Sequence, residues 1–138
     1  MKLINYQYKG RSFDKTLVVK PGEEVNLTTI SVYNKPRQTG QVSIRAVVRE
    51  NAFLKLKGII KIKKGAVQAD GFLRQKVLLV GENSRAEAIP ELEIECDDVR
   101  ASHAASVGRI DEEQLFYLMS RGLSREEAVE LIVDAFLS

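Results

Sequence analysis

Apolar and polar residues alternate along much of the first 110 residues, and this alternation predicts β-strands. It is clearest in Phe53–Lys63, where leucines and isoleucines alternate with four lysines. A period of two places one row of side chains in a core and the other row in solvent. Gly58, at the middle of this segment, indicates a bend or a bulge in the strand. The other predicted strands are Thr16–Lys20, Val25–Tyr33, Gln41–Arg49, Gln75–Val80 and Glu91–Glu95.

Turn residues separate these strands. Pro21 and Gly22 form a turn pair, and Pro36 and Gly40 punctuate the loop that follows Val25–Tyr33. The strands recur at intervals of roughly 15–20 residues with little helical patterning between them, and such spacing is typical of a β-sandwich or of the stacked coils of a β-solenoid. The pattern alone leaves both folds open.

The last residues carry the signals of two short helices. Asp111 stands three residues before Gln114, which is a variant of the capping box, and Ser124 with Glu127 forms a capping box proper. Gly122 lies where a left-handed residue ends the first helix. The second helix is predicted to bury one stripe, made of Ala128, Leu131, Ile132, Ala135 and Phe136. We therefore expect a β body at residues 1–110 and a helical hairpin at residues 111–138.

Composition narrows the class of protein. The chain has 138 residues, of which 44% are hydrophobic, enough for one core. Its 21 basic and 19 acidic residues leave a net charge of +2, which gives no reason to expect a nucleic-acid or membrane partner. No apolar run approaches the roughly 18–20 residues of a membrane span, and residues 1–15 do not resemble a signal peptide. We expect a cytoplasmic protein.

The sequence offers little catalytic chemistry. It has one histidine, His103, and one cysteine, Cys96, and no glycine-rich phosphate loop. The acidic pairs Asp97-Asp98 and Glu112-Glu113 do not indicate acid–base catalysis, because strand neighbours face opposite ways and acids at helix starts act as caps. The lysines of residues 55–64 alternate with core positions, which favours a solvated strand face over a phosphate or nucleic-acid site. We expect no enzymatic activity.

Several segments follow one another in a characteristic order and spacing: Phe53–Gly65 (FLKLKGIIKIKKG), Val77–Val80 with Gly81-Glu82-Asn83, Ile89–Ile94 (IPELEI), Asp98–Gly108 (DVRASHAASVG), Gln114–Tyr117 (QLFY), and Ser120–Leu123 (SRGL) followed by Glu127-Ala128. Together they resemble the SufB/SufD scaffold proteins of the SUF system for iron–sulfur cluster assembly. The resemblance covers about residues 27–138. It implies a mainly β fold: a short right-handed parallel β-helix, or β-solenoid, over residues 1–110, followed by an αα-hairpin. Family members are much longer, so this chain corresponds to their last coils and terminal helices.

The resemblance implies a non-enzymatic scaffold or adaptor that binds a SufC-like ABC-type ATPase. In the family the terminal helices make this contact, which here points to Leu115, Phe116, Tyr117, Arg121 and Arg125. A run of coils also leaves an unpaired edge, which residues 1–25 would cap or which would form a dimer surface. The second partner is then the chain itself, as a homodimer, or a longer SufB/SufD homologue. The alternative is a self-associating module that kept the fold and lost cluster chemistry.

His103 matches a histidine that SufD carries at its interface with SufB, where it is proposed to help hold a nascent cluster. His103 is therefore a candidate metal ligand, with a transient iron–sulfur cluster at an interface; the alternative is a structural or interface histidine. The cysteine that accepts sulfur in SufB corresponds to about Gln75, and a glutamate after its histidine corresponds to Ala104. Acidic neighbours disfavour a reactive thiolate at Cys96, so we expect a structural cysteine rather than a redox or metal site.

Overall fold

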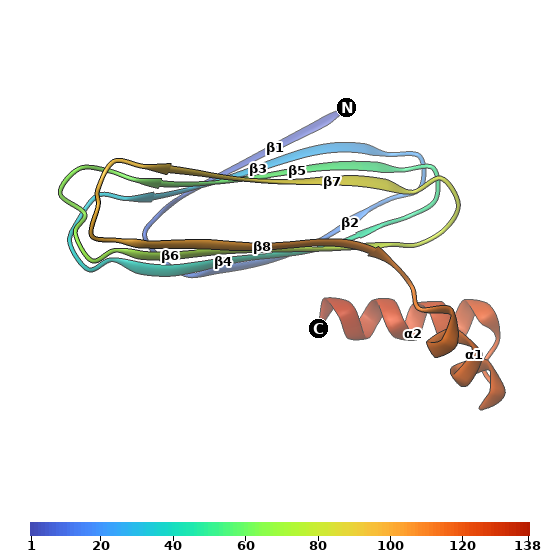
Figure 1. Cartoon of the computed structure of the whole chain (residues 1–138). Helices are drawn as coiled ribbons and strands as arrows, with labels where there is room; N and C mark the ends of the chain where they lie inside the picture. Colours follow the sequence, from blue (N-terminus) through green and yellow to red (C-terminus); the bar gives the residue numbers. More distant parts are fainter.

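The computed structural model describes the backbone of residues 1–138 and every side chain except those of Tyr8 and Lys9. It shows a β-solenoid followed by two helices (Figure 1). The solenoid implied by the resemblance is confirmed, and the sandwich alternative is excluded. The elements are β1 (Lys2–Lys9), β2 (Phe13–Val19), β3 (Glu24–Tyr33), β4 (Thr39–Val48), β5 (Phe53–Ile62), β6 (Asp70–Leu79), β7 (Arg85–Ile94), β8 (Arg100–Arg109), α1 (Glu112–Ser120) and α2 (Arg125–Leu137).

The strands form two parallel sheets, because each coil gives one strand to each sheet. The first sheet has the order β1-β3-β5-β7 and the second has the order β2-β4-β6-β8. In Figure 1 the chain runs leftward along β7 and rightward along β8, and the fainter β1 and β2 lie behind them. The coils therefore wind in the right-handed sense, as strand twist favours for parallel connections.

Equivalent residues of successive coils stack in register, and the inward rows make the core. Val25 of β3 pairs with Leu54 of β5, which pairs with Ala86 of β7. In the second sheet Ile44, Gln75 and Ala105 form the corresponding column. The two sheets bury their inward rows against each other, and the largest fully buried side chains include Tyr33, Leu27, Ile44, Leu54, Leu56, Ile60 and Ile62. Burial of these apolar side chains is the main stabilising contribution to the fold.

Gly58 does not bend or bulge its strand. β5 runs without interruption from Phe53 to Ile62 and keeps its register with β3 and β7. A Cβ atom at Gly58 would lie 2.5 Å from Cδ2 of Leu73 and 2.9 Å from Nε2 of Gln75. The bend predicted here is therefore wrong: the glycine leaves room for two side chains that reach across the core from β6.

Residues 1–25 do not merely cover an edge. β1 and β2 add a further coil, in parallel register with β3 and β4. β7 is also longer than the predicted Glu91–Glu95 segment, since it begins at Arg85.

Both helices begin at the predicted N-caps, Asp111 and Ser124, but the capping-box variant expected between Asp111 and Gln114 is wrong. The side chain of Asp111 accepts a hydrogen bond of 2.9 Å from the backbone N–H of Glu113. Ser124 and Glu127 form the reciprocal capping box, and Gly122 has a φ of 101°. The burial stripe predicted for α2 is partly wrong, because Leu131 is 50% exposed and Ala135 is also exposed.

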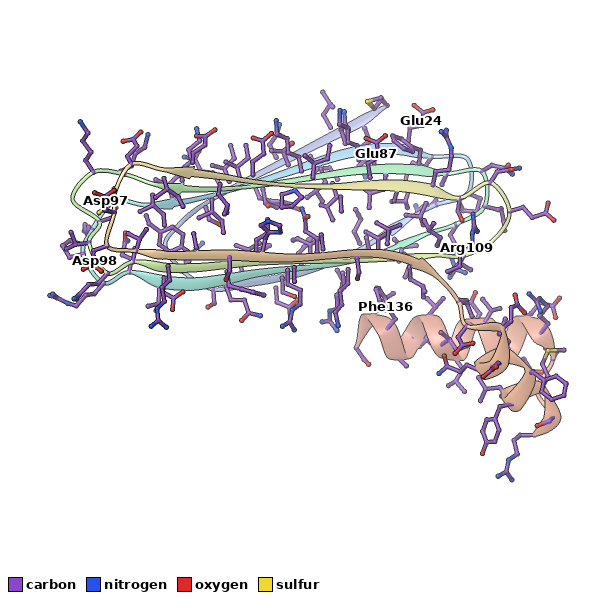
Figure 2. The ribbon with its side chains drawn as sticks, in the orientation of Figure 1. Glu24, Glu87, Asp97, Asp98, Arg109 and Phe136 are labelled. Atoms are coloured by element: carbon purple, nitrogen blue, oxygen red, sulfur yellow. The ribbon has the colours of Figure 1, made fainter. Side chains whose placement is uncertain are left out.

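α2 instead packs on the outer face of the second sheet. Val133 is buried with Val47 of β4 and Val80, and Val129, Leu78, Phe136 and Leu137 pack around them. Figure 2 shows Phe136 extending from α2 toward the solenoid. This small second core holds the hairpin beside the last coils.

Candidate functional site

The solenoid ends in two strands that each have a neighbour on one side only. β7 pairs with β5, and β8 pairs with β6. The backbone N–H groups of Arg85 and Glu95 donate toward β5, so the alternate residues of β7 direct theirs to the free edge. Arg100 donates to Ala69, so His103 and the other odd-numbered residues of β8 face the free edge in the same way. The terminal coil therefore presents two open edges, nearest the viewer in Figure 1.

The inward rows of this coil are only partly covered. Leu92 and Ile94 of β7 are 38% and 45% exposed, and Val107 of β8 is 41% exposed. In the preceding coil the register partners of Leu92 and Ile94, which are Ile60 and Ile62, are 1% and 0% exposed. The end of the solenoid is thus an apolar core surface bordered by unpaired backbone, which is the usual makeup of a pairing surface.

His103 belongs to this surface. It is in register with the buried Leu73, so it lies on the inward row of the second sheet, and it is exposed because no further coil covers it. Gln75, its diagonal neighbour on the same inward row, is 0% exposed and pairs in register with Ala105. Its Nε2 donates to the backbone oxygen of Leu56 at 3.4 Å. Its Oε1 has no hydrogen-bond partner among the described residues.

The metal-binding capacity of this end is small. Among the side chains that the structure describes, no three His, Cys, Asp or Glu residues come together as a metal site. Cys96, in the turn after β7, is half-buried and packs against the main core. Asp97 and Asp98 follow it in the same turn, on the side of the solenoid away from the helices (Figure 2). A cluster needs about four ligands, which is more than the described side chains bring together here.

The outer face of the first sheet explains the row of lysines. Lys57 pairs with Glu91 at 3.2 Å, Lys61 with Glu93 at 3.6 Å, and the next pair joins Lys63 to Glu95 at 3.9 Å. These partly exposed pairs match the expectation of a solvated strand face, and each contributes at most about 1 kcal/mol.

The helical hairpin carries a second exposed apolar surface. On α1, Phe116 is 75% exposed, Tyr117 is 55% exposed and Met119 is 41% exposed. The guanidinium of Arg121 lies 5.3 Å from the centre of the Tyr117 ring and donates to its hydroxyl at 3.0 Å. Leu115 is different, because it is only 1% exposed and does not belong to this surface.

Arg125 is also partly engaged, since it joins the two helices by pairing with Glu112 at 3.2 Å. A groove of about 740 Å³ lies between the hairpin and the last coils. The other two arginines that line it, Arg49 and Arg109, also have hydrogen-bond partners within the chain. Arg49 binds Glu130, and Arg109 donates to the backbone oxygen of Gly81 at 3.1 Å.

Neither helix of the described chain is long and apolar enough to cross a membrane.

Similar proteins place this chain in a family. The family described as "SUF system FeS cluster assembly, SufBD core domain" matches residues 9–136. The chain is 42% identical to the iron-sulfur cluster assembly protein SufD of Bacillus subtilis over 125 residues, which are 90% of this chain and 29% of that protein. It is 39% identical to SufD of Escherichia coli over 92 residues, which are 67% of this chain and 22% of that protein.

An archaeal relative agrees with these matches. An iron-sulfur cluster assembly SufBD family protein of Archaeoglobus fulgidus is 34% identical over 125 residues, which are 91% of this chain and 33% of that protein. The chain thus spans about a fifth to a third of the length of these three relatives. With its parallel solenoid, its terminal hairpin and a family match over residues 9–136, the chain belongs to the SufBD family of the SUF iron–sulfur cluster assembly system.

Proposed function

We propose that this chain is a non-enzymatic scaffold or adaptor in cytoplasmic iron–sulfur cluster assembly, which handles the cluster as cargo. The observation that carries the proposal is the open terminal coil, where the free edges of β7 and β8 border a partly exposed inward face that includes His103. The names of its relatives support the process, since each is an iron-sulfur cluster assembly protein.

The first partner is a second solenoid that docks on the open coil, either another copy of this chain or a longer SufB/SufD homologue. Its strands would pair with β7 and β8 and cover Leu92, Ile94 and Val107. At such an interface His103 would supply one ligand to a cluster and the partner would supply the others.

A matched pair of substitutions tests this contact. Val107→Asp places a charge in the apolar surface of the terminal coil. Val18→Asp is the control, because it places the same charge on β2, away from that surface, at a side chain that is 39% exposed. Light scattering after size exclusion should show that Val107→Asp abolishes association and Val18→Asp does not. Equal association of both variants would rule out docking at the terminal coil.

The second partner is a SufC-like ABC-type ATPase, which would dock on α1. Phe116, Tyr117 and Arg121 form its exposed face, Leu115 would support this face from within, and Arg125 would hold the two helices together. An exposed aromatic beside an arginine is a frequent centre of binding energy in protein interfaces.

Co-purification with the ATPase of the same organism, with and without ATP, tests this contact. Phe116→Ala should weaken binding by about 2 kcal/mol, as expected for an aromatic hot spot. Leu131→Ala removes another half-exposed apolar side chain from α2 and should leave binding unchanged. A complex that tolerates Phe116→Ala would contradict docking on α1.

Iron retention tests the role of His103 as a ligand. Anaerobic reconstitution of the assembled complex, followed by absorption spectroscopy, should show less bound iron in His103→Ala than in the wild type. Equal iron in the two proteins would leave His103 as an interface residue.

A self-associating module without cluster chemistry is the second candidate. The buried amide of Gln75 favours it, because the resemblance to SufB puts the sulfur-accepting cysteine at about this position, and Gln75 has no thiol. A chain that dimerises through the terminal coil but binds neither iron nor the ATPase would be this module.

A further inference from the structure

We propose that Gln75 is a positioning residue for His103: its Oε1 accepts a hydrogen bond from the imidazole and selects one tautomer of the ring. This inference rests on the proposed function only in giving His103 a role as a ligand, because the contact that it proposes lies within one chain.

The first observation is an acceptor without a partner in a buried place. Gln75 is 0% exposed, and its Nε2 is held against β5 by the backbone oxygen of Leu56. The close approach of Nε2 to the Cβ position of Gly58 shows that the amide reaches across the core to the first sheet. The remaining oxygen has no partner among the described residues, and an unsatisfied buried acceptor is costly.

The second observation is that the terminal coil supplies one suitable donor. Within residues 85–110, all of which the structure describes, the inward rows are Ala86, Ala88, Pro90, Leu92 and Ile94 in β7, and Ala101, His103, Ala105, Val107 and Arg109 in β8. Only His103 and Arg109 of these carry a side-chain donor. Arg109 is occupied at the far end of β8, where it donates to Gly81 and Ser84.

The register makes the contact reachable. His103 pairs with Leu73 and Gln75 pairs with Ala105, so the two polar residues are diagonal neighbours on adjacent strands. Diagonal neighbours on one face of a sheet are within reach of aromatic and long side chains. The residue in register with Gln75 is the small Ala105, and the exposed imidazole of His103 changes rotamer at little cost.

The hydrogen bond would have a chemical consequence. A neutral imidazole has one N–H and one acceptor nitrogen, and the partner of the N–H decides which nitrogen is which. With its N–H directed into the core toward Gln75, His103 would present the other nitrogen, with its lone pair, at the open coil. Ligating histidines are commonly oriented in this way by a second residue.

The single histidine makes the test direct. Long-range proton–nitrogen NMR of the ¹⁵N-labelled chain, without iron or any partner, reads the two ring nitrogens of His103 at a pH where imidazole is neutral. We expect one tautomer to exceed the other by about 2- to 10-fold more than in a free peptide, which is the range of a single net hydrogen bond.

Gln75→Met and Gln75→Leu remove the acceptor and should return the tautomer ratio to that of a free peptide. Gln41→Met is the matched control, because Gln41 is exposed on the outer face of β4. A ratio that is unchanged in the folded Gln75 variants would overturn the inference.

If both Gln75 variants fail to fold, the wild type still decides. A nuclear Overhauser effect between the ring of His103 and the side-chain amide of Gln75 supports the contact, and its absence overturns it. Because these measurements need neither iron nor the ATPase, a locked tautomer in a chain that binds neither would refute the proposed function and leave the Gln75 contact standing.

Discussion

The guanidinium of Arg49, directly after β4, donates two hydrogen bonds to the carboxylate of Glu130 in α2, at 2.7 and 3.1 Å. This two-point contact ties the helical hairpin to the solenoid beside the small core of Val47, Val80 and Val133. The hydrogen bond raises the pKa of Arg49 and lowers the pKa of Glu130. The attachment of the hairpin is therefore partly electrostatic and depends on pH.

The first prediction concerns this pH dependence. Since the folded state lowers the pKa of Glu130, the stabilisation is present above the unfolded carboxyl pKa and is lost as the pH falls through the folded value. Glu130→Gln should cost about 0.5 kcal/mol at pH 7, and the difference from wild type should shrink near pH 3. Urea titrations at both pH values measure this, with Glu82→Gln as an exposed control. A cost that persists undiminished in acid would contradict the assignment.

The second prediction concerns the close approach at Gly58. Gly58→Ala places a Cβ against Leu73 and Gln75, so it should reduce the free energy of unfolding by about 1–3 kcal/mol through overpacking. Gly108→Ala is the matched control, because a Cβ there meets nothing within 4 Å. Chemical denaturation compares the two variants. If Gly58→Ala were as stable as Gly108→Ala, the core around Gln75 would have to be looser than described.

The third prediction concerns the cap of α2. The Ser124 side chain accepts from the backbone of Glu127 at 3.1 Å, and the Glu127 carboxylate accepts from the backbone of Ser124 at 3.1 Å. Ser124→Ala should lower stability by about 1 kcal/mol. Ser120→Ala removes a hydroxyl that only donates to the Tyr117 carbonyl, so it should have little effect. Thermal unfolding followed by circular dichroism distinguishes them, and equal losses would argue against the cap.

The fourth prediction concerns the local stability of the hairpin. Val133→Ala removes buried methyl groups between α2 and the second sheet and should cost about 2 kcal/mol. Because this core is separate from the main one, the loss should appear as faster amide exchange in α1 and α2, with little change in β3 to β6. Leu131→Ala, at a half-exposed position, should leave exchange unchanged. A uniform acceleration along the whole chain would show that the two cores unfold together.

How much could be predicted from the sequence varied along the chain. β5 was recognisable because apolar residues alternate with lysines, and the alternation reports burial directly. β8 has little such contrast, since its outward row after Arg100 is Ser102, Ala104, Ser106 and Gly108 and its inward row includes His103. That segment was identified only by its resemblance to a family. The α2 stripe was misplaced because Leu131 fits a helical period as well as Val133 does.

The candidate site, too, could be predicted from the sequence only in part. The sequence by itself determined the strand periods, the helix caps and the presence of one histidine, because these depend on neighbours within a few residues. The tertiary structure alone decided that the strands stack as a solenoid, that His103 faces inward on an uncovered coil, and that Gln75 is buried beside it. These features depend on pairing between residues about thirty positions apart, and a local pattern of polar and apolar residues is compatible with more than one such pairing.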